Sequence, residues 1–475
     1  MNTATVGEVA ATLHAMGTDP IVALWADSTP LKDVGWSTSR GLARKFLSRA
    51  RDEWVEMGLR ALGLSKNAFV LPPLTPWSSC APLPQAEHLH RSAIRKLTYR
   101  GAPVGRAVLQ VHPDSETPIT DDHGWPRLWV EESIRSFAWA FDQSHELLTG
   151  TQSTALVVFN GRFLHDSAAS SAAQQLGLPV LSFDFGGNDT DFDLTIDDTH
   201  DWSALQRRML TMYDAWDPSE RNVIGASWFD ERRQHTDPRN YLFTESQKLG
   251  TGVDKPDGKR LVVFFSSSGD EISELDLDWG EFFFGQEGAL NSVARMCREM
   301  DDVILLVRTH PHKRRKPKRD VEDWHAAVAA AAPDVHLDEF SEVDSYTLML
   351  QADVVVTYGS TTGVEAAHAG RPVVVMGPSA YDELGCATRV TTDAQLRQAL
   401  SIAESGKREG SAAYGLMMRR RGFINRYVRR IDGSQVLGGI RIRDAHPLVL
   451  KISHRRAERR RAQLRTSRAP SANVS

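Results

Sequence analysis

A regular alternation of short apolar runs and amphipathic segments fills the stretch from residue 261 to residue 403. The apolar runs predict strands at Leu261–Phe265, Val303–Val307, Val335–Leu337, Val354–Thr357 and Pro372–Met376. Between and after them, helical spacing of apolar residues predicts helices at Gly288–Met300, Val321–Ala331, Asp344–Leu350, Thr361–Ala369 and Ala394–Ala403. Strands that alternate with helices are typical of a parallel sheet covered on both faces, so this half is expected to be a doubly wound α/β domain.

The first half shows a weaker form of the same pattern. Strands are expected at Ile21–Trp25, Ala155–Phe159 and Pro179–Phe183, and helices at Val6–Met16, Arg40–Leu62 and Asp166–Leu176. A chain of 475 residues is too long for one ordinary core. We therefore expect an N-terminal domain over residues 1–250, a second domain over 251–410, closing helices over 411–450 and a basic, disordered tail over 451–475. One of these helices should run from about Ala413 to Ile431.

The composition is that of a soluble globular protein, with 41% hydrophobic and 25% charged residues. No apolar run approaches the roughly 20 residues of a membrane helix, and the N-terminus lacks the pattern of a signal peptide. The three cysteines lack metal-binding spacing and are expected to be reduced thiols of a cytoplasmic protein. A net charge of −5 does not favour nucleic acid as a partner.

Polar clusters follow two of the predicted strands where each strand ends. Arg308-Thr309-His310-Pro311-His312 follows one, and Tyr358-Gly359-Ser360-Thr361-Thr362 follows another. The carboxyl ends of parallel strands meet at one edge of the sheet, where ligands bind in open α/β folds. Together, imidazoles, hydroxyls and a helix start suit an anionic, phosphate-bearing ligand.

Each cluster has a simpler explanation as well. His310 and His312 can donate to a phosphate oxygen or can belong to a polar turn, and the basic residues 313–316 after them are expected to be solvated. Thr362 and Glu365 have the spacing of a capping box. That box does not account for Gly359, Ser360 and Thr361, and Glu365 can also accept from ribose hydroxyls. The run from Ser266 and Ser267 to Asp270 and Glu271 is either a plain turn or a third part of the site.

Other site types find little support. Neither half has a dinucleotide-binding G-x-G-x-x-G after a strand, or a Walker A lysine motif. The D-x-D strings Asp276-Leu277-Asp278 and Asp191-Phe192-Asp193 are read as solvated acidic loops, so no metal site and no cofactor is expected.

These motifs resemble those of a known group of enzymes. His310-Pro311 after a strand and Ser360-Thr361 at a helix start resemble two motifs of bacterial sialyltransferases and of capsule-polysaccharide transferases that use cytidine-monophosphate sugars. Residues 350–373 resemble the donor half of GT-B glycosyltransferases and also CDP-glycerol phosphotransferases. In the first half, Phe159-Asn160-Gly161-Arg162 and Tyr99–Arg106 resemble capsule and surface-carbohydrate synthesis proteins. The acidic catalytic motif of sialyltransferases is not evident, and Asp184-Phe185-Gly186-Gly187 does not match it.

The resemblance implies a GT-B fold, with two Rossmann-like domains facing a cleft, and a metal-independent glycosyltransferase. The second domain would bind a nucleotide-sugar, with a CMP-sugar favoured, and the first would bind a capsular, surface or lipid-linked glycan acceptor. His310, His312, Ser266, Ser267, Gly359, Ser360, Thr361 and Thr362 would hold the donor and its leaving phosphate, and Glu365 its ribose. Asn160 and Arg162 would line the acceptor side, and the candidate bases are Asp184, Asp270 and Glu271.

Two other enzymes fit the same scaffold, a CDP-alditol phosphotransferase and a UDP-sugar 2-epimerase, and so does a non-catalytic binding protein of polysaccharide assembly. The C-terminal end adds one further expectation. Lys451–Arg468 contains eight Lys or Arg residues and one Glu. It is either a solvated tail or a reversible contact with anionic lipids on the inner face of the plasma membrane.

Overall fold

The computed structural model describes residues 3–23, 54–70, 78–79, 81–85, 91–111, 125–187, 191–196, 200–237, 239–268, 283, 285–316, 318–431 and 434–442. The chain divides by its internal contacts into two units. One combines Met1–Ser78 with Ile424–Ser475, and the other is Ser79–Phe423. The boundary expected near residue 250 lies inside the second unit, between its two sheets. The expected tail, residues 451–475, lies outside the described residues.

The first unit joins the two ends of the chain. It contains α1 (Thr3–Ala15), a helical segment over residues 54–61, η1 (Lys66–Ala68) and the short parallel strands β1 (Val22–Ala23) and β2 (Phe69–Val70). It also contains an antiparallel meander of β13 (Val428–Ile431), β14 (Ser434–Leu437) and β15 (Ile440–Ile442). Glu8 is fully buried, and its carboxylate accepts the backbone N–H groups of residues 426–428 at 2.6–2.8 Å. This buried carboxylate ties α1 to the start of the meander.

The helix expected over Ala413–Ile431 is shorter than the sequence suggests. The helix α15 spans Arg408–Arg420, and the chain then enters β12 (Phe423–Ile424) and β13. Gly422 has a φ of +94°, a conformation that glycine adopts without strain. Arg429 and Arg430 therefore lie on β13 and Arg426 lies in the bend before it, so the prediction of one basic helix was wrong.

The second unit begins with helices that pack against one another and against the helix of the βαβ unit that follows, which is part of a small sheet. These helices are α3 (Arg91–Arg95), α4 (Val104–Val111) and α5 (Trp125–Gly150). The expected βαβ unit follows as β3 (Leu156–Phe159), α6 (Leu164–Gln175) and β4 (Val180–Phe185), with the two strands parallel. An unexpected strand, β5 (Asp191–Thr195), pairs antiparallel with β4. The Tyr99–Arg106 segment is structural, because Tyr99 is buried and its hydroxyl donates to Asp142 of α5 at 2.8 Å.

Three long helices and one short helix connect this sheet with the next. They are α7 (Trp202–Ala215), α8 (Arg221–Arg233) and α15, with the four-residue α9 (Tyr241–Thr244). The close approach of α8 and α15 depends on two glycines. A Cβ at Gly225 would lie 2.5 Å from the carbonyl oxygen of Ala412, and one at Gly415 would lie 2.3 Å from that of Gly225. Larger side chains at these positions would force the two helices apart.

Among the described residues, the larger sheet has six parallel strands. These are β6 (Arg260–Phe265), β7 (Val303–Arg308), β8 (Val335–Leu337), β9 (Val354–Thr357), β10 (Val373–Val375) and β11 (Thr388–Arg389). Their spatial order is β8-β7-β6-β9-β10-β11, so the direction of winding reverses between β6 and β9. This is the strand order of the doubly wound dinucleotide-binding fold, in which the reversal opens a crevice at the carboxyl edge.

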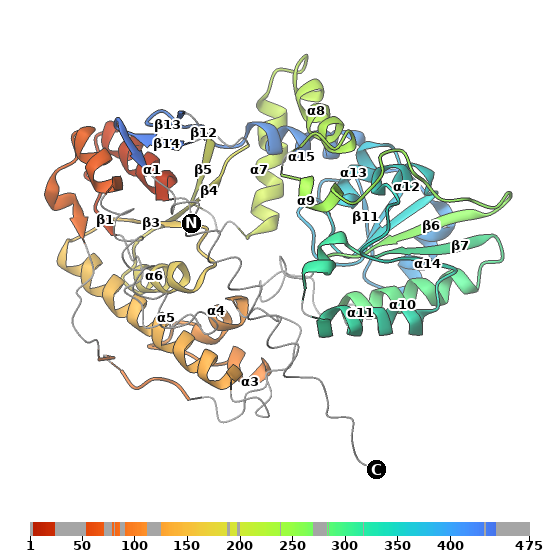
Figure 1. The fold of residues 1–475 in the computed structure, drawn as a ribbon, viewed down its shortest axis with the longest axis horizontal. Coiled ribbons are helices and arrows are strands. Elements are labelled where there is room, and N and C mark those ends of the chain that lie inside the picture. The colour runs from red at the N-terminus through yellow and green to blue at the C-terminus, as the bar shows by residue number, and fades with distance from the viewer. Residues whose placement is uncertain are drawn as a thin grey trace, which may run out of the picture. The chain divides into compact units, whose positions relative to one another are not determined.

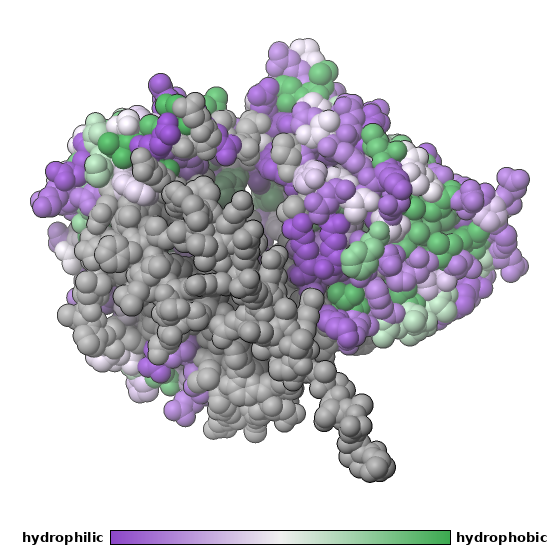
Figure 2. Space-filling view, in the orientation of Figure 1, coloured by the Kyte–Doolittle hydropathy of each residue, from purple (hydrophilic) through white to green (hydrophobic). Residues whose placement is uncertain are grey.

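Helices cover both faces of the larger sheet (Figure 1). Residues of α12 (Ser345–Gln351), α13 (Thr362–His368), α8 and α15 share one apolar core with the side chains of Val263 and Phe265. Residues of α10 (Gly285–Arg298), α11 (Lys318–Ala331) and α14 (Asp393–Ile402) share another core with Val262 and Phe264. On the face shown in Figure 2, hydrophilic residues predominate over this half and hydrophobic residues form smaller patches. The predicted α/β class and the alternation of elements are confirmed.

Candidate active site at the carboxyl edge of the larger sheet

The register of the sheet places three polar loops at the same level. Phe265, the last residue of β6, lies opposite Arg308 of β7 on one side and Thr357 of β9 on the other. Neighbouring strands are about 4.8 Å apart, so the chains that leave β7 and β9 start about 10 Å from each other. The loop that begins at Ser266 lies between them. The prediction that the three clusters share one edge therefore agrees with the strand order.

Ser266 fixes the loop that carries the two histidines. It is 1% exposed, and its hydroxyl oxygen accepts the backbone N–H of His310 at 2.8 Å. Its own N–H donates to the carbonyl of Arg308 at 3.1 Å. Ser266 thus positions His310, a role that the sequence did not suggest.

His310 is held in one neutral tautomer. It precedes η4 (Pro311–Arg315), and its Nδ1 accepts the backbone N–H of His312 at 3.2 Å. Burial lowers the pKa of His310 to about 3, and the neighbouring charges of His312, Arg308 and Lys313 act in the same direction. An imidazole that accepts at Nδ1 and stays neutral carries its proton on Nε2. The side chain therefore presents an N–H donor at neutral pH.

An aromatic contact supports both histidine rings. The ring of Phe243, on α9, lies edge to face with His310 at 5.3 Å and with His312 at 5.9 Å between centroids. This contact limits the motion of His310 and helps to keep its donor in one direction.

The basic run after the histidines is not the solvated approach that we expected. Lys313 is 2% exposed, and its ammonium lies 5.3 Å from the ring centre of Trp324, a cation–π contact. Arg314 pairs with Glu245, and Arg315 pairs with the same carboxylate at 3.1 Å. The run thus anchors η4 to its surroundings, because each of these three side chains has a defined partner.

Buried Arg308 connects β7 to the loop after β8. Its guanidinium donates to the carbonyl of Asp338 at 2.5 Å and to that of Ser341 at 3.2 Å, and the side chain is 1% exposed. Burial lowers its pKa to about 10, while Asp338 and Glu339 oppose the shift. Arg308 is therefore still charged at neutral pH and contributes positive potential beneath His310.

The loop after β9 is built around Gly359, whose φ is +79°. A Cβ at this position would lie 2.0 Å from the carbonyl oxygen of Pro378, so only glycine fits. The hydroxyl of Thr357 accepts the N–H of Ser360 at 2.9 Å, and the hydroxyl of Tyr381 donates to the carbonyl of Ser360 at 2.6 Å. These bonds hold the Ser360 backbone from both sides. The Tyr381 contact has no signal in the sequence pattern.

The hydroxyl cluster divides into buried and exposed parts. Ser360 is 7% exposed, and its hydroxyl contacts that of Thr362 at 3.2 Å. Thr361 is exposed and is the N-cap residue of α13, yet its side chain makes no capping hydrogen bond. Its hydroxyl is thus placed to meet a ligand. The helix α13 has only seven residues, so its dipole contributes little to any anion contact.

The capping box predicted for Thr362 and Glu365 does not form. Glu365 is 6% exposed and accepts a hydrogen bond from Arg232 Nε at 2.5 Å. Arg232 also pairs with Asp237 at 3.3 Å. Burial acts to lower the pKa of Arg232, but the neighbouring charges, that of Glu365 foremost, outweigh burial and raise it. A carboxylate so paired is committed to holding α13 against α8. This geometry gives no support to its expected contact with a ribose.

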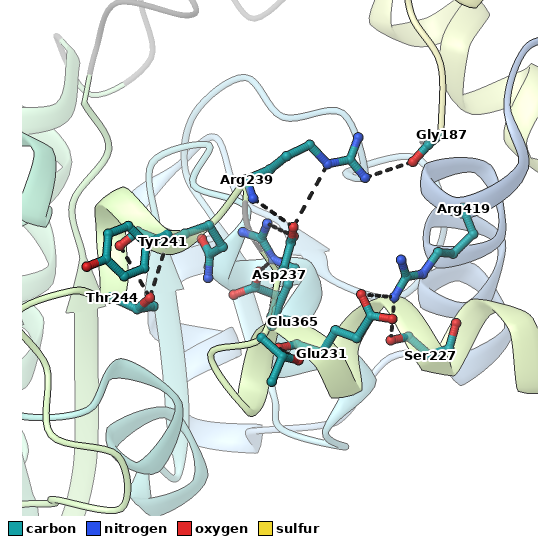
Figure 3. Close-up of polar contacts among 12 residues, drawn as sticks. Gly187, Ser227, Glu231, Asp237, Arg239, Tyr241, Thr244, Glu365 and Arg419 are labelled. Carbon is teal, nitrogen blue, oxygen red and sulfur yellow. Dashed lines mark hydrogen bonds and ion pairs between the residues drawn. The ribbon is translucent and has the colours of Figure 1, made fainter. Parts of the chain in front are cut away.

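The same network extends toward the end of β4. Figure 3 shows Asp237 beside Glu365, with Arg239 reaching from Asp237 to the backbone of Gly187. The Arg239 guanidinium donates to the carbonyl of Gly187 at 2.7 Å, and its backbone N–H donates to Asp237 at 2.9 Å. The loop after β4 is therefore tied to the start of α9.

The remaining predicted donor residues lie at the edge of the described chain. Ser267 N–H donates to the side-chain oxygen of Gln286 at 2.5 Å, and the Ser267 hydroxyl is buried with no hydrogen-bond partner among the described residues. Asp270, Glu271 and the Asp276-Leu277-Asp278 string lie outside the described residues. Their predicted roles stay predictions.

In the smaller sheet, two predicted residues meet. Asn160 follows β3 and Asp184 lies in β4, and the Asn160 amide donates to the Asp184 carboxylate at 2.6 Å. The other oxygen of Asp184 accepts the N–H of Phe185 at 2.7 Å. Arg162 lies over the ring of Phe163, with 5.7 Å from the guanidinium carbon to the ring centre. The sequence assigned Asn160 to acceptor binding and Asp184 to catalysis, and the structure places them side by side.

The second acidic string is not a solvated loop. Asp191-Phe192-Asp193 forms most of β5, and Asp193 is 8% exposed. Its two carboxylate oxygens accept from Arg208 of α7 at 2.9 and 2.5 Å. A bidentate ion pair of this kind serves to fix α7 to the sheet.

One titratable residue in this region escaped the sequence analysis. Asp166 lies in the first turn of α6, and burial raises its pKa from 3.8 to about 7. The adjacent His165 has its pKa lowered to about 4, again by burial. A carboxyl group that titrates near neutral pH is suited to general acid–base catalysis. No motif marks Asp166, since burial raises its pKa while a backbone hydrogen bond acts in the opposite direction.

No group of three or more metal-binding side chains comes together in the described ranges. None of the helices that the structure describes is both long and apolar enough to cross a membrane.

Comparison with known proteins supports the resemblance seen in the motifs. Residues 280–426 match the family model of capsule polysaccharide biosynthesis proteins. This stretch includes His310-Pro311, Gly359 and the hydroxyl cluster, and it begins after Ser266. None of the curated proteins compared with the chain matches it.

Several solved structures share parts of the fold at low similarity. The KpsC beta Kdo 2,4 transferase of Thermosulfurimonas dismutans is 15% identical, over 55% of this chain and 79% of its own, with a TM-score of 0.36. The KpsC beta Kdo 2,7 transferase of the same organism is 14% identical, over 62% and 86%, with a TM-score of 0.37. MurG of Acinetobacter baumannii is 15% identical, over 61% and 74%, with a TM-score of 0.25. At such values the likenesses do not indicate a shared activity.

Proposed function

We propose that this protein is a glycosyltransferase that moves a sugar from a nucleotide-activated donor, preferably a CMP-sugar, to a capsular, surface or lipid-linked glycan. The observation that carries the proposal is the neutral His310, whose Nε2–H is fixed at the carboxyl edge of a doubly wound sheet. The match of residues 280–426 to capsule polysaccharide biosynthesis proteins supports the choice of glycan chemistry. In this proposal the edge of the larger sheet holds the donor, and the edge of the smaller sheet holds the acceptor.

The donor phosphate would lie between the loops after β7 and β9. His310 Nε2–H and the Thr361 hydroxyl would donate to its oxygens, with Gly359 allowing close approach of the backbone. His312, Thr362 and Ser267 would complete the site, while Ser266 and Ser360 hold the loops in place. A neutral N–H donor stabilises the negative charge that builds on the departing nucleotide, and buried Arg308 adds a positive potential. Glu365 would keep α13 in position and would not bind ribose.

The acceptor hydroxyl needs a base, and two described carboxylates belong to the βαβ unit of the smaller sheet. Asp166, with a pKa of about 7, can take a proton at neutral pH. Asp184 is held by Asn160 and Phe185 and would orient the acceptor. Asp270 and Glu271 remain alternative bases from the loop after β6. The displacement needs no metal in this proposal, and activity should survive an excess of chelator.

A CDP-alditol phosphotransferase and a UDP-sugar 2-epimerase remain the alternative enzymes, and a binding protein of polysaccharide assembly the alternative without catalysis. The domain limits proposed from the sequence, 1–250, 251–410 and 411–450, would correspond to acceptor, donor and closing segments. The protein would work in the cytoplasm, with the basic tail, residues 451–475, in contact with anionic lipids at the inner face of the plasma membrane.

The test is incubation of the full chain with CMP-, UDP-, GDP- and CDP-activated compounds, followed by mass spectrometry of the products. A glycosyltransferase transfers the sugar of one activated donor to water or to an added glycan and releases the nucleotide. A phosphotransferase acts on CDP-glycerol and leaves a phosphodiester in its product. An epimerase interconverts free UDP-sugars without an acceptor. Binding without turnover of any compound would favour the assembly protein and contradict the proposal.

A further inference from the structure

A row of phenylalanines lies at the carboxyl edge of the smaller sheet. Phe159 contacts Phe163 at 6.1 Å with nearly parallel rings, and it contacts Phe185 edge to face at 5.9 Å. A fourth ring, Phe183, lies edge to face with Phe159 at 5.5 Å and is 4% exposed. The two outer rings are open to solvent, with Phe163 41% exposed and Phe185 48% exposed. The row thus has a buried support and two exposed members.

Exposed aromatic rings that pack on the same neighbouring ring mark a place where a ligand can replace water. Phe163 belongs to the turn between β3 and α6, and Phe185 ends β4. Because β3 and β4 are parallel neighbours with Phe159 opposite Phe183, both exposed rings lie at the edge where α/β sheets bind ligands.

A rigid polar pair borders these rings. Asn160 adjoins Phe159, and Asp184 lies between Phe183 and Phe185 in the sequence. The bonds from the Asn160 amide and the Phe185 N–H fix the Asp184 carboxylate, and each oxygen of a carboxylate can accept a second hydrogen bond. Asn160 has a φ of +60° and Gly161 a φ of +78°, so a tight left-handed turn sets the direction of this pair. The polar groups are thus fixed before any ligand arrives.

This combination fits one ligand chemistry well. A pyranose ring has a face of C–H groups, which packs on an aromatic ring, and a rim of hydroxyls, which donate to carboxylate oxygens. Phenylalanine rings offer the first contact and the fixed Asp184 the second. Arg162 lies over Phe163 and brings a positive charge to the same edge, which is compatible with an acidic sugar.

We infer that Phe163 and Phe185, with Asp184 and Asn160, form a subsite for one pyranose residue of the acceptor glycan. The inference rests on the proposed function for the identity of the ligand as an acceptor. It adds Phe163 and Phe185 as residues that determine acceptor binding, through packing on the C–H face of a sugar. The Asp184 carboxylate orients a hydroxyl of the bound sugar, and the two rings bind its C–H face.

The test uses methyl glycosides of glucose, galactose and glucuronic acid as probes of the full chain, read by saturation-transfer NMR at millimolar concentration. We expect transfer to the ring C–H protons of at least one glycoside. Phe163→Ala and Phe185→Ala should each weaken binding at least about fivefold, since each removes a stacking surface. Asp184→Asn should weaken it as well and leave the C–H contacts in place. Phe340→Ala is the matched control, since Phe340 is 63% exposed in the loop after β8 and should leave glycoside binding unchanged.

CMP binding to the same proteins, measured by calorimetry, distinguishes failure of the subsite from failure of the proposed function. CMP binding without saturation transfer to any glycoside would overturn the subsite and leave the donor site intact. Glycoside binding that depends on Phe163 and Phe185, without binding of any nucleotide, would support the subsite and count against the proposed function. Glycoside binding that survives both phenylalanine substitutions, or CMP binding that is lost in them, would overturn the subsite. Thermal melts of both variants exclude unfolding as the cause.

Discussion

The hydroxyl of Ser266 accepts the backbone N–H of His310 at 2.8 Å, across two neighbouring strands of the larger sheet. This bond fixes the position of the His310 backbone relative to the end of β6. Since Nδ1 of the same imidazole accepts from His312, both the backbone and the ring of His310 are fixed. The candidate donor site thus depends on a residue that need not touch the ligand.

Ser266→Ala tests this positioning role. The change leaves the His310 N–H without its acceptor and should lower stability by about 1 kcal/mol. Turnover should fall more than nucleotide affinity, because the misplaced imidazole affects the leaving group most. Chemical denaturation gives the stability, and steady-state kinetics separate kcat from KM. An unchanged kcat with the expected loss of stability would assign Ser266 a purely structural role.

Thr361 and Ser360 form a matched pair of adjacent hydroxyl residues. Thr361 is exposed and makes no capping hydrogen bond, so Thr361→Ser should be neutral and Thr361→Val should weaken nucleotide binding with little effect on melting temperature. Ser360 is nearly buried and bonded within the loop, so Ser360→Ala should cost up to about 1 kcal/mol of stability. Melting curves with and without nucleotide measure both effects. Unchanged affinity in Thr361→Val would remove the hydroxyl from the donor site.

The raised pKa of Asp166 predicts a pH-dependent stability. The folded state holds the proton up to about pH 7, whereas an unfolded aspartate loses it near pH 3.8. The contribution of Asp166 to the free energy of unfolding is therefore greatest below about pH 4 and is lost as the pH rises to 7. Asparagine does not ionise, so Asp166→Asn should not lose stability in this pH range. The variant should be more stable than the wild type at pH 8, by up to about 4 kcal/mol, with little difference at pH 4.

The same variant tests the proposed catalytic role of Asp166. As the general base, Asp166 should give an ionisation near pH 7 in kcat/KM, and Asp166→Asn should lack that ionisation and have low activity. The exposed Asp214 of α7 is the control, and Asp214→Asn should change stability little at any pH. Full activity in Asp166→Asn would shift the base to Asp184, Asp270 or Glu271.

The sequence predicts the donor half of the fold well because the signal there is local. The strands β6 to β10 are runs of β-branched and apolar residues, and their alternation with helices determines a parallel sheet. The position of His310 after a strand follows from the same pattern. By contrast, β5 carries two aspartates in five residues, and its strand state depends on pairing with β4 and on Arg208.

Long-range partners account for most of what sequence reasoning missed. The spacing of Thr362 and Glu365 fits a capping box, but Arg232, distant in the sequence, binds the carboxylate instead. The run that begins at Lys313 has the composition of a solvated segment, yet Trp324 covers its lysine. The exposed rings of Phe163 and Phe185 also have no local signal, because each looks like an ordinary apolar residue near a strand end.

The central claim is that a neutral His310 stabilises the leaving phosphate of a nucleotide-sugar. The most direct measurement compares nucleotide release from CMP-sugars by the wild type, His310→Gln and His310→Ala. Glutamine keeps an N–H donor at the same reach, and alanine does not. The account predicts release by the wild type, at least about 10²-fold slower release by His310→Ala and an intermediate rate for His310→Gln, with both variants folded at the assay temperature. A His310→Ala enzyme that releases the nucleotide at the rate of the wild type would contradict it.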